Sequence, residues 1–366
     1  MLNEMDDVIS LGVGEPDFVT PWGIIEAGIY SLEKGQTSYS TNAGFLELRN
    51  EISAYLEKRF GTYYNADDEI LVTVGGSEAI DIALRALVQE GDEVIIPEPG
   101  FVAYKGCTAF TGATPVVIEL RQEDEFKLTV RQLEKAVSDK TKVLILPYPN
   151  NPTGAIMTRA ELKPIVDFLK DKEIIVISDE IYAELTYSGR HTSIAGFEEI
   201  NDRVIVVSGF SKAFAMTGWR IGYVCAGSIL MDAMKKIHQY AIMCSPTTAQ
   251  KAAVEGLRSQ LREVESMVAE YNRRRRVLLD GFLKSGLKCF EPQGAFYLFP
   301  DVSSTGLTGD EFCEKLLKEE QILCVPGSAF GDCGKTFIRA TYATSMDNII
   351  EAVNRIKKFV TRIGGL

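Results

Sequence analysis

Histidine and closely spaced cysteine are nearly missing from this chain. Two histidines occur in 366 residues, and the seven cysteines are scattered without a C-x-x-C pair. These residue types are the usual zinc ligands, so the composition argues against a metal site. The odd cysteine count also argues against a disulfide framework and favours a reducing compartment. We therefore predict a cytoplasmic protein without a bound metal.

Positive charge is scarce as well. Lys and Arg number 39 against 51 Asp and Glu, which gives a net charge of -12. Nucleic acid and anionic membranes repel such a chain, and we expect neither as a partner. The densest basic run, 273–276, lies in a Glu-rich helical pattern and is most simply explained as a solvated helix face. No run of 18 apolar residues occurs, and residues 1–10 lack the basic and apolar regions of a secretory leader.

Short apolar runs that alternate with helical patterns are abundant from residue 70 onwards. Seven runs are apolar almost throughout, as in strands buried on both faces: 70–74, 93–97, 115–120, 143–147, 174–178, 204–207 and 221–226. Helical patterns such as 77–89 and 158–170 separate them. This alternation predicts an α/β domain with a mostly parallel seven-stranded sheet flanked by helices.

Shorter strand patterns and two helical patterns follow residue 284 and predict a smaller α+β domain. A long helical region at 245–286 leads into it. We predict an N-terminal segment, 1–35, that packs with the small domain, a large domain at 36–284 and the small domain at 285–366.

The turn between the sixth and seventh apolar runs carries a lysine, Lys212, in the sequence Ser-Gly-Phe-Ser-Lys. Most loop lysines are solvated cations. Here two serines, Ser208 and Ser211, and an arginine, Arg220, lie nearby, and apolar flanks would desolvate the amine and lower its pKa. A desolvated lysine beside hydroxyls and a guanidinium suits covalent chemistry with a phosphorylated aldehyde.

Three turns after strand patterns offer further polar or aromatic groups. The amides of Gly76, Ser77 and Glu78 open a helix and either bind an anion or form a plain capped turn. Phe101 either packs in the core or offers a face for a planar heterocycle. Asn151 lies in the rigid turn Pro-Asn-Asn-Pro-Thr-Gly, which needs no function by itself.

Two charged residues interrupt apolar strand patterns. Asp179 ends the run 174–179 and is followed three residues later by Tyr182, and Arg339 lies inside the run 337–342. Either charge could belong to an internal salt bridge. Because ligands collect at the carboxyl ends of strands in open α/β sheets, we expect these groups to share one site.

Together these features resemble the class I and II aminotransferases, which are pyridoxal phosphate enzymes of fold type I. The resemblance runs from Leu11 to the C-terminus and rests on three motifs in order, Asn-Pro-x-Gly, Asp-x-x-Tyr and Ser-Lys-x7-Arg-x-Gly. It implies a homodimer with the site at the subunit interface. It also implies ping-pong transfer of an amino group between an aromatic or aspartate-type L-amino acid and a 2-oxo acid such as 2-oxoglutarate.

The resemblance assigns roles to individual residues. Lys212 would bind the cofactor covalently and move the proton, Asp179 would face the pyridine nitrogen, and Phe101 would stack on the ring. Tyr182 and Asn151 would bind the ring's phenolic oxygen. The phosphate would be held by Arg220, Ser211, the amides near Gly76, Ser77 and Glu78, and Tyr39 of a neighbouring subunit. Arg339, with Asn151 and the backbone at Gly14, would bind the substrate α-carboxylate.

Two features depart from the family pattern. Gly209 stands where many relatives carry a hydroxyl on the phosphate, so Ser208 or a water would substitute for it. The chain also begins close to the motif Leu-Gly-Val-Gly-Glu-Pro, whereas many relatives have a preceding arm that packs on the partner subunit.

Three other functions share part of this pattern. A carbon-sulfur β-lyase would use the same cofactor and the same motifs. A nicotinamide oxidoreductase would need a G-x-G-x-x-G loop, which the turn at Gly76 lacks. A regulator that only binds the cofactor would need a DNA-binding domain, which the acidic chain does not offer.

Overall fold

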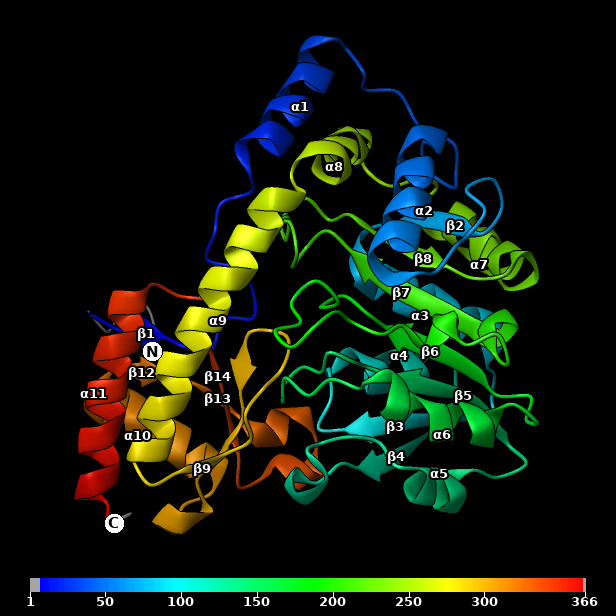
Figure 1. Ribbon diagram of the computed structural model, residues 1–366. Coiled ribbons are helices and arrows are strands. Elements are labelled where there is room, and N and C mark those ends of the chain that lie inside the picture. The colour runs from blue at the N-terminus through cyan, green and yellow to red at the C-terminus, as the bar shows by residue number, and fades with distance from the viewer. Residues whose placement is uncertain (1–6, 365–366) are drawn as a thin grey trace.

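A seven-stranded sheet is the centre of the computed structural model, which describes residues 7–364 (Figure 1). Its strand order is β2-β8-β7-β6-β5-β3-β4, and among the described strands of this sheet β8 alone runs opposite to the others. The strands are β2 (Ile70–Thr73), β3 (Glu93–Glu98), β4 (Thr114–Glu119), β5 (Thr141–Leu146), β6 (Ile175–Asp179), β7 (Val204–Gly209) and β8 (Gly222–Cys225). The predicted mostly parallel sheet is confirmed.

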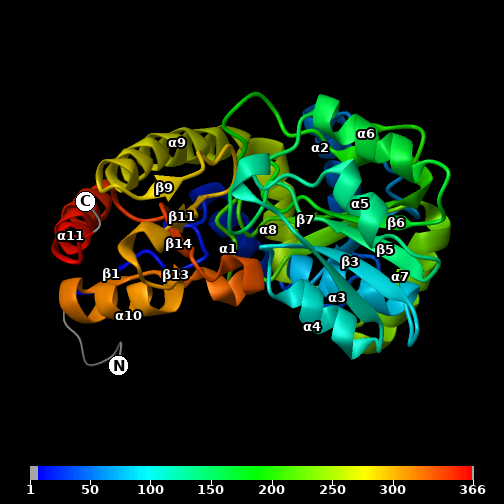
Figure 2. The same ribbon diagram turned by 90° about the horizontal axis from the view of Figure 1, so that it is seen from below.

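Helices cover both faces of this sheet, which explains why its strands are apolar throughout. Along β5, Val143 and Ile145 belong to one core, while Leu144 and Leu146 belong to the other. Successive side chains of a strand point to opposite faces, so each strand contributes to both cores. In Figure 2 the helices α3 (Gly75–Leu87), α4 (Ala103–Phe110) and α7 (Ser228–Ala241) lie on one face, and α2 (Leu46–Phe60), α5 (Val130–Ala136) and α6 (Arg159–Leu169) lie on the other.

A smaller group of elements follows the long helix α9 (Leu261–Lys284). The predicted helical region 245–286 is divided at Gln260, because α8 (Thr247–Ser259) ends there before α9 begins. The later elements are β9 (Lys288–Cys289), β10 (Tyr297–Leu298), β11 (Pro300–Asp301), α10 (Gly309–Glu320), β12 (Ile322–Leu323), β13 (Val325–Pro326), β14 (Ile338–Thr341) and α11 (Met346–Arg362). The N-terminal strand β1 (Ile9–Ser10) pairs in parallel with β12.

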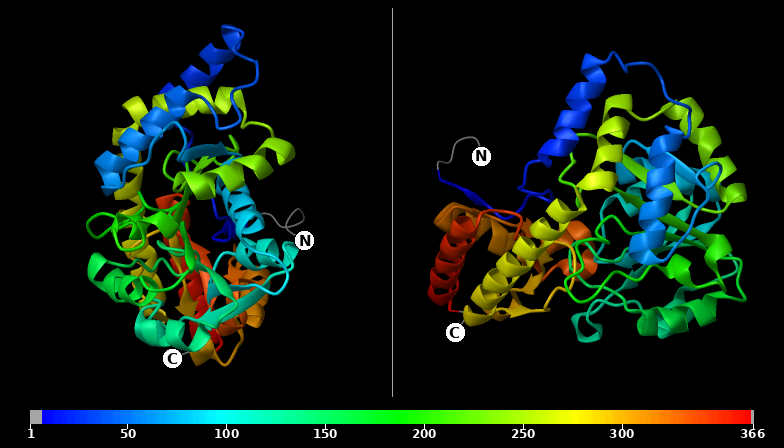
Figure 3. Two further views of the ribbon diagram at one scale, coloured as in Figure 1. Left: turned by 90° about the vertical axis from the view of Figure 1, so that its right-hand side faces the viewer. Right: turned by 45° about the horizontal axis from the view of Figure 1, so that its top comes forward.

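The helix α1 (Trp22–Glu33) projects beyond the sheet and packs on α8 (Figures 1 and 3). Gly28 lies between α8 and the Trp219 ring, since a Cβ there would lie 3.7 Å from Ala252 of α8 and only 2.9 Å from the ring. The outer side of α1 exposes the apolar side chains of Trp22, Ile29, Tyr30 and Leu32.

The carboxyl ends of the parallel strands meet at one edge of the sheet. There β2 leads into α3, β3 into Phe101, β5 into Asn151, β6 ends at Asp179, and β7 leads into Lys212. This edge faces β10 and β14, so residues from distant parts of the chain converge on it. Within residues 7–364, no helix is both long and apolar enough to span a bilayer.

Candidate active site

A cavity of about 490 Å³ opens where the strand ends meet the N-terminal segment and β14. It brings together eleven of the fourteen predicted site residues. These are Gly14, Gly76, Ser77, Phe101, Asn151, Asp179, Tyr182, Ser211, Lys212, Arg220 and Arg339. The volume is within the range of small-molecule sites and suits a cofactor with a substrate.

Lys212 lies three residues beyond the end of the central strand β7 and is largely removed from water. Its Nζ donates a hydrogen bond to the Gly14 carbonyl oxygen at 2.6 Å. Burial lowers the pKa of the amine to about 8, with Arg339 and Arg220 adding to the effect and Glu15 opposing it. A large part of the amine is therefore neutral and nucleophilic in mildly alkaline solution.

Asp179 is a buried carboxylate without a cationic side chain in ion-pair contact among the described residues. Its Oδ2 accepts a hydrogen bond from the Tyr104 hydroxyl at 2.7 Å, and its Oδ1 accepts one from the Ile181 amide at 3.1 Å. Burial raises the pKa of the carboxyl, while both hydrogen bonds oppose the rise. Such a carboxylate would gain from a cationic partner, and a protonated ring nitrogen is one.

An anion site forms where α3 begins. Gly76 and Ser77 lie in the first turn of this 13-residue helix and line the cavity. Arg220 lies across the same turn, with Nη1 donating to the Thr217 carbonyl at 3.0 Å. A Cβ on Gly75 would lie 2.6 Å from Arg220 Nη2, so glycine lets the guanidinium approach the helix end. Free amides, the helix dipole and a guanidinium together suit a phosphate.

The departure at Gly209 has a steric cause. Gly209 pairs with Gly222 of the antiparallel strand β8, and a Cβ at 209 would lie 2.8 Å from the Gly222 Cα atom. A hydroxyl-bearing side chain would therefore collide with the neighbouring strand.

Ser208 does not replace the missing hydroxyl. It belongs to β7 and donates to the Glu180 carbonyl at 3.3 Å, on the side away from the cavity. Period-two alternation explains the error, because adjacent strand residues point to opposite faces.

Two more predicted residues lie outside the cavity. The Glu78 carboxylate turns back to the Val74 amide and the His238 ring, so its side chain supports the α3 turn from behind. Tyr39 is 76% exposed and is not among the residues that line this cavity. Its predicted role was in a neighbouring subunit, which a single chain does not test.

Arg339 has no carboxylate within ion-pair distance among residues 7–364, so the internal salt bridge considered from the sequence is absent there. Its Nη1 donates to Asn151 Oδ1 at 3.0 Å and its Nη2 to the Gly12 carbonyl at 2.7 Å. Its Nε is buried without a hydrogen-bond partner. A buried guanidinium with an unused donor is suited to an incoming carboxylate.

Tyrosines complete the wall beside Arg339. The Tyr182 and Tyr297 hydroxyls lie 2.8 Å apart, and burial raises the pKa of both. Lys212 Nζ lies 5.8 Å from the centre of the Tyr182 ring. Phe101 also lines the cavity and meets Tyr104 edge to face, at 5.7 Å between ring centres.

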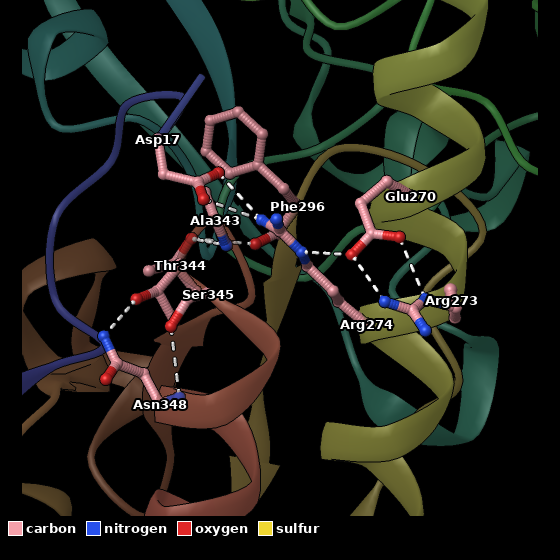
Figure 4. Close-up of polar contacts among 10 residues, drawn as sticks. Asp17, Glu270, Arg273, Arg274, Phe296, Ala343, Thr344, Ser345 and Asn348 are labelled. Atoms are coloured by element: carbon pink, nitrogen blue, oxygen red, sulfur yellow. Dashed lines mark hydrogen bonds and ion pairs between the residues drawn. The ribbon is translucent and has the colours of Figure 1, made fainter. Parts of the chain in front are cut away.

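The N-terminal segment that carries Gly14 is fastened to α9 (Figure 4). Arg274 Nη1 donates to both carboxylate oxygens of Asp17, at 2.9 and 2.8 Å, and Arg274 Nε donates to Glu270 at 2.9 Å. This ion-pair cluster holds one wall of the cavity in place.

Sequence reasoning missed four polar residues that line the cavity: Glu15, Tyr104, Thr217 and Tyr297. Glu15 accepts a hydrogen bond from Thr217 at 3.0 Å. Glu15 and Thr217 lie inside motifs already singled out for other residues, and Tyr104 lies three residues after Phe101, so proximity to those residues was an available signal. Tyr297 lies in an ordinary apolar strand pattern, and no signal in the sequence distinguishes it.

The fold and this site define the class of pyridoxal phosphate-dependent enzymes of fold type I. The family Aminotransferase class I and II matches residues 6–356. The chain therefore belongs to this family and is an aminotransferase.

Individual relatives agree with this assignment. The chain is 51% identical to YugH of Bacillus subtilis, a protein named only provisionally as an aminotransferase, over 97% of this chain and 92% of the relative. It is 43% identical to an aspartate aminotransferase of Pyrococcus abyssi, over 97% and 92%. The solved structure of an aromatic aminotransferase from Pyrococcus horikoshii superposes with a TM-score of 0.96, at 42% identity over 100% and 99% of the two chains. The comparisons give no support to a lyase or a nicotinamide enzyme.

The residues present fit pyridoxal phosphate, the cofactor of this family. The amine of Lys212, the buried Asp179 carboxylate and the anion site at α3 match its aldehyde, ring nitrogen and phosphate in chemistry. When bound, the cofactor withdraws electrons from the bonds at the α-carbon of an amino acid.

Proposed function

We propose that the cavity residues carry the roles that the family resemblance implies. Lys212 Nζ would hold the cofactor, and after the amino acid displaces it, the neutral amine would accept the proton of the substrate α-carbon. Its lowered pKa and its burial support this role, because a general base works best when its pKa lies near the working pH.

We propose the remaining contacts with the cofactor from the same family resemblance. Asp179 would face the ring nitrogen, Phe101 would stack on the ring, and Tyr182 with Asn151 would bind the phenolic oxygen. The phosphate would be bound by Arg220, Ser211, Ser77 and the Gly76 amide. Their common lining of one cavity supports these assignments.

We propose that the amino donor is an aromatic or aspartate-type L-amino acid and that the acceptor is a 2-oxo acid such as 2-oxoglutarate. The observation that carries the proposal is the buried Arg339 with its unpartnered Nε, which suits the α-carboxylate common to all of these substrates. Apolar side chains line the rest of the cavity and favour an aromatic substituent: Val13, Ile80, Phe101, Pro149 and Ile181. The names of the Pyrococcus relatives cover both donor types.

A screen of amino donors against 2-oxoglutarate tests this proposal. We expect glutamate to form from tyrosine, phenylalanine or aspartate, with parallel double-reciprocal plots because the mechanism is ping-pong. Lys212→Ala is the control and should abolish transfer. If neither aromatic donors nor aspartate react while other amino acids do, the proposed substrate class is wrong.

We further propose a cytoplasmic homodimer in which Tyr39 enters the partner's phosphate site. The exposed apolar face of α1 supports an interface, since a patch of this kind is unusual on a monomer. Seven free cysteines support a reducing compartment. The division into segments 1–35, 36–284 and 285–366 also remains a proposal, and the pairing of β1 with β12 supports it.

A further inference from the structure

We propose that Tyr297 is a positioning residue that links the α-carboxylate site at Arg339 to the Tyr182 hydroxyl, and so transmits carboxylate binding to the cofactor's phenolic oxygen. The inference rests on the proposed roles of Tyr182 and Arg339. Asn151 already joins these two parts, because it is proposed to bind the phenolic oxygen and its Oδ1 accepts a hydrogen bond from Arg339 Nη1. Tyr297 adds a second connection between them.

The first contact is between two hydroxyls. Tyr297 is fully buried, and its hydroxyl lies 2.8 Å from that of Tyr182, with the rings edge to face. Gly14 leaves room for this pair, because a Cβ there would lie 2.9 Å from the Tyr297 oxygen. A tyrosine hydroxyl has one hydrogen, so when Tyr182 donates to a cofactor oxygen, it can only accept from Tyr297.

The second contact is between a ring and a guanidinium. Tyr297 pairs with Thr341 across β10 and β14, which makes Arg339 its diagonal neighbour on the same face of the ribbon. The Arg339 guanidinium carbon lies 4.4 Å from the centre of the Tyr297 ring, well within cation–π distance. The charge of the guanidinium therefore acts on the ring and, through it, on the hydroxyl.

The two contacts give the link a direction. Burial raises the pKa of the Tyr297 hydroxyl and the Arg339 guanidinium lowers it, so a carboxylate that neutralises the guanidinium charge makes the hydroxyl a weaker donor. In a dry site, a donor to Tyr182 strengthens the hydrogen bond that Tyr182 itself donates. A donor to the phenolic oxygen stabilises negative charge there and lowers the proton affinity of the neighbouring imine nitrogen.

The substitution Tyr297→Phe tests the hydroxyl alone, because it keeps the ring beneath Arg339. The readout is the pH midpoint at which the visible band of the holoenzyme changes, with no substrate present. We expect this midpoint to rise by about half to one pH unit, the size of one neutral hydrogen bond. The Michaelis constant for the amino donor should change less than about threefold, since the ring remains.

Tyr342→Phe is the matched control. Tyr342 is also fully buried and donates to the Ala295 carbonyl, but it does not line the cavity. It should leave the midpoint unchanged. An unshifted midpoint in Tyr297→Phe, or an equal shift in Tyr342→Phe, would overturn the proposal.

A double substitution separates this inference from the proposed function. In a Tyr182→Phe background, Tyr297→Phe should add no further shift, because the effect passes through Tyr182. If Tyr182→Phe itself leaves the midpoint unchanged, the proposed role of Tyr182 fails. If it raises the midpoint and Tyr297→Phe does not, only the link fails. In wild-type enzyme, 3-phenylpropionate should raise the midpoint, because it weakens the hydrogen bond that Tyr297 donates. Tyr297→Leu should make this rise smaller, and an equal rise in the variant would overturn the link.

Discussion

At the scale of single residues, this site is built from charges that have few partners of opposite sign. Lys212 donates to a carbonyl, Asp179 accepts from a tyrosine, and Arg339 contacts an amide and a carbonyl. Within residues 7–364, none of these three charges has an internal salt bridge, and leaving a buried charge unpaired is costly. This cost is consistent with side chains whose charges are paired only when a charged ligand binds.

The titration of Lys212 follows from this arrangement. In the apoprotein its pKa is lowered by burial to about 8 from 10.5. We expect acetylation of Lys212 by acetic anhydride to have its pH midpoint near 8, measured by peptide mass spectrometry against the exposed Lys284. A midpoint above 10 would contradict the burial argument.

The same pKa has a consequence for stability with a definite sign. Between pH 8 and 10.5 the unfolded chain holds the Lys212 proton and the folded apoprotein does not. The penalty for burying the charged amine is thus full below pH 8 and is lost as the pH rises to 10.5. Compared with Lys212→Met, the wild-type apoprotein should gain stability across this window, as measured by urea unfolding.

Arg339 should contribute to substrate binding rather than to retention of the cofactor. Arg339→Ala should raise the Michaelis constant of the amino donor by roughly 10- to 150-fold, since a charge-assisted bidentate contact contributes about 1.5–3 kcal/mol. The visible band of the bound cofactor should persist. Steady-state kinetics and absorbance test both points together, and unchanged kinetics would remove Arg339 from the substrate site.

At the scale of elements, the ion pair between Asp17 and Arg274 joins the N-terminal segment to α9. The neighbouring Arg273 offers a matched comparison, because both arginines pair with Glu270 and only Arg274 reaches Asp17 (Figure 4). The Arg274 side chain is 9% exposed, whereas that of Arg273 is 64% exposed.

We expect Arg274→Met to lower the free energy of unfolding by about 1–3 kcal/mol, because it leaves the Asp17 carboxylate without its partner. It should also raise the Michaelis constant of the donor, since Gly14 and Glu15 are then less firmly held. Arg273→Met should change stability by less than about 1 kcal/mol, as for exposed pairs. Equal effects of the two substitutions, in urea unfolding and in kinetics, would show that Asp17 is not the relevant partner.

At the scale of the whole molecule, several apolar side chains among the described residues are exposed in a single chain, and two groups of them suit an interface. One is the outer side of α1, and the other is the end of α7, where Tyr240 is almost fully exposed. An interface between two copies would cover such surfaces, and it would bring Tyr39 to the partner's site as proposed.

Mixed dimers test this arrangement. Tyr39→Phe should weaken cofactor binding in a homodimer, and Lys212→Ala should be inactive. A mixed dimer of the two contains one site with both Lys212 and an intact Tyr39 from the other subunit. We expect refolding the two variants together to restore one high-affinity site per dimer, measured by cofactor titration. No restoration would place Tyr39 in its own subunit's site or in none.

How much of the structure the sequence predicted depends on whether the interaction joins residues that are close together or far apart in the chain. Local patterns identified all seven strands of the sheet, and the position of Asp179 and Lys212 at strand ends placed them near one another. These features depend on periodicity and on the geometry of parallel sheets, which act over short stretches of chain. The family resemblance then implied the chemistry of the site.

The sequence by itself determined the sheet, the class of enzyme and most of the residues at the cavity. Only the tertiary structure decided that Ser208 points away, that Gly209 is required by the close approach of Gly222, and that Tyr104 supports Asp179. It also decided that Tyr297 lies between Tyr182 and Arg339. These contacts join residues far apart in the chain, and their existence depends on how the strands and the smaller group of elements pack, which no local pattern records.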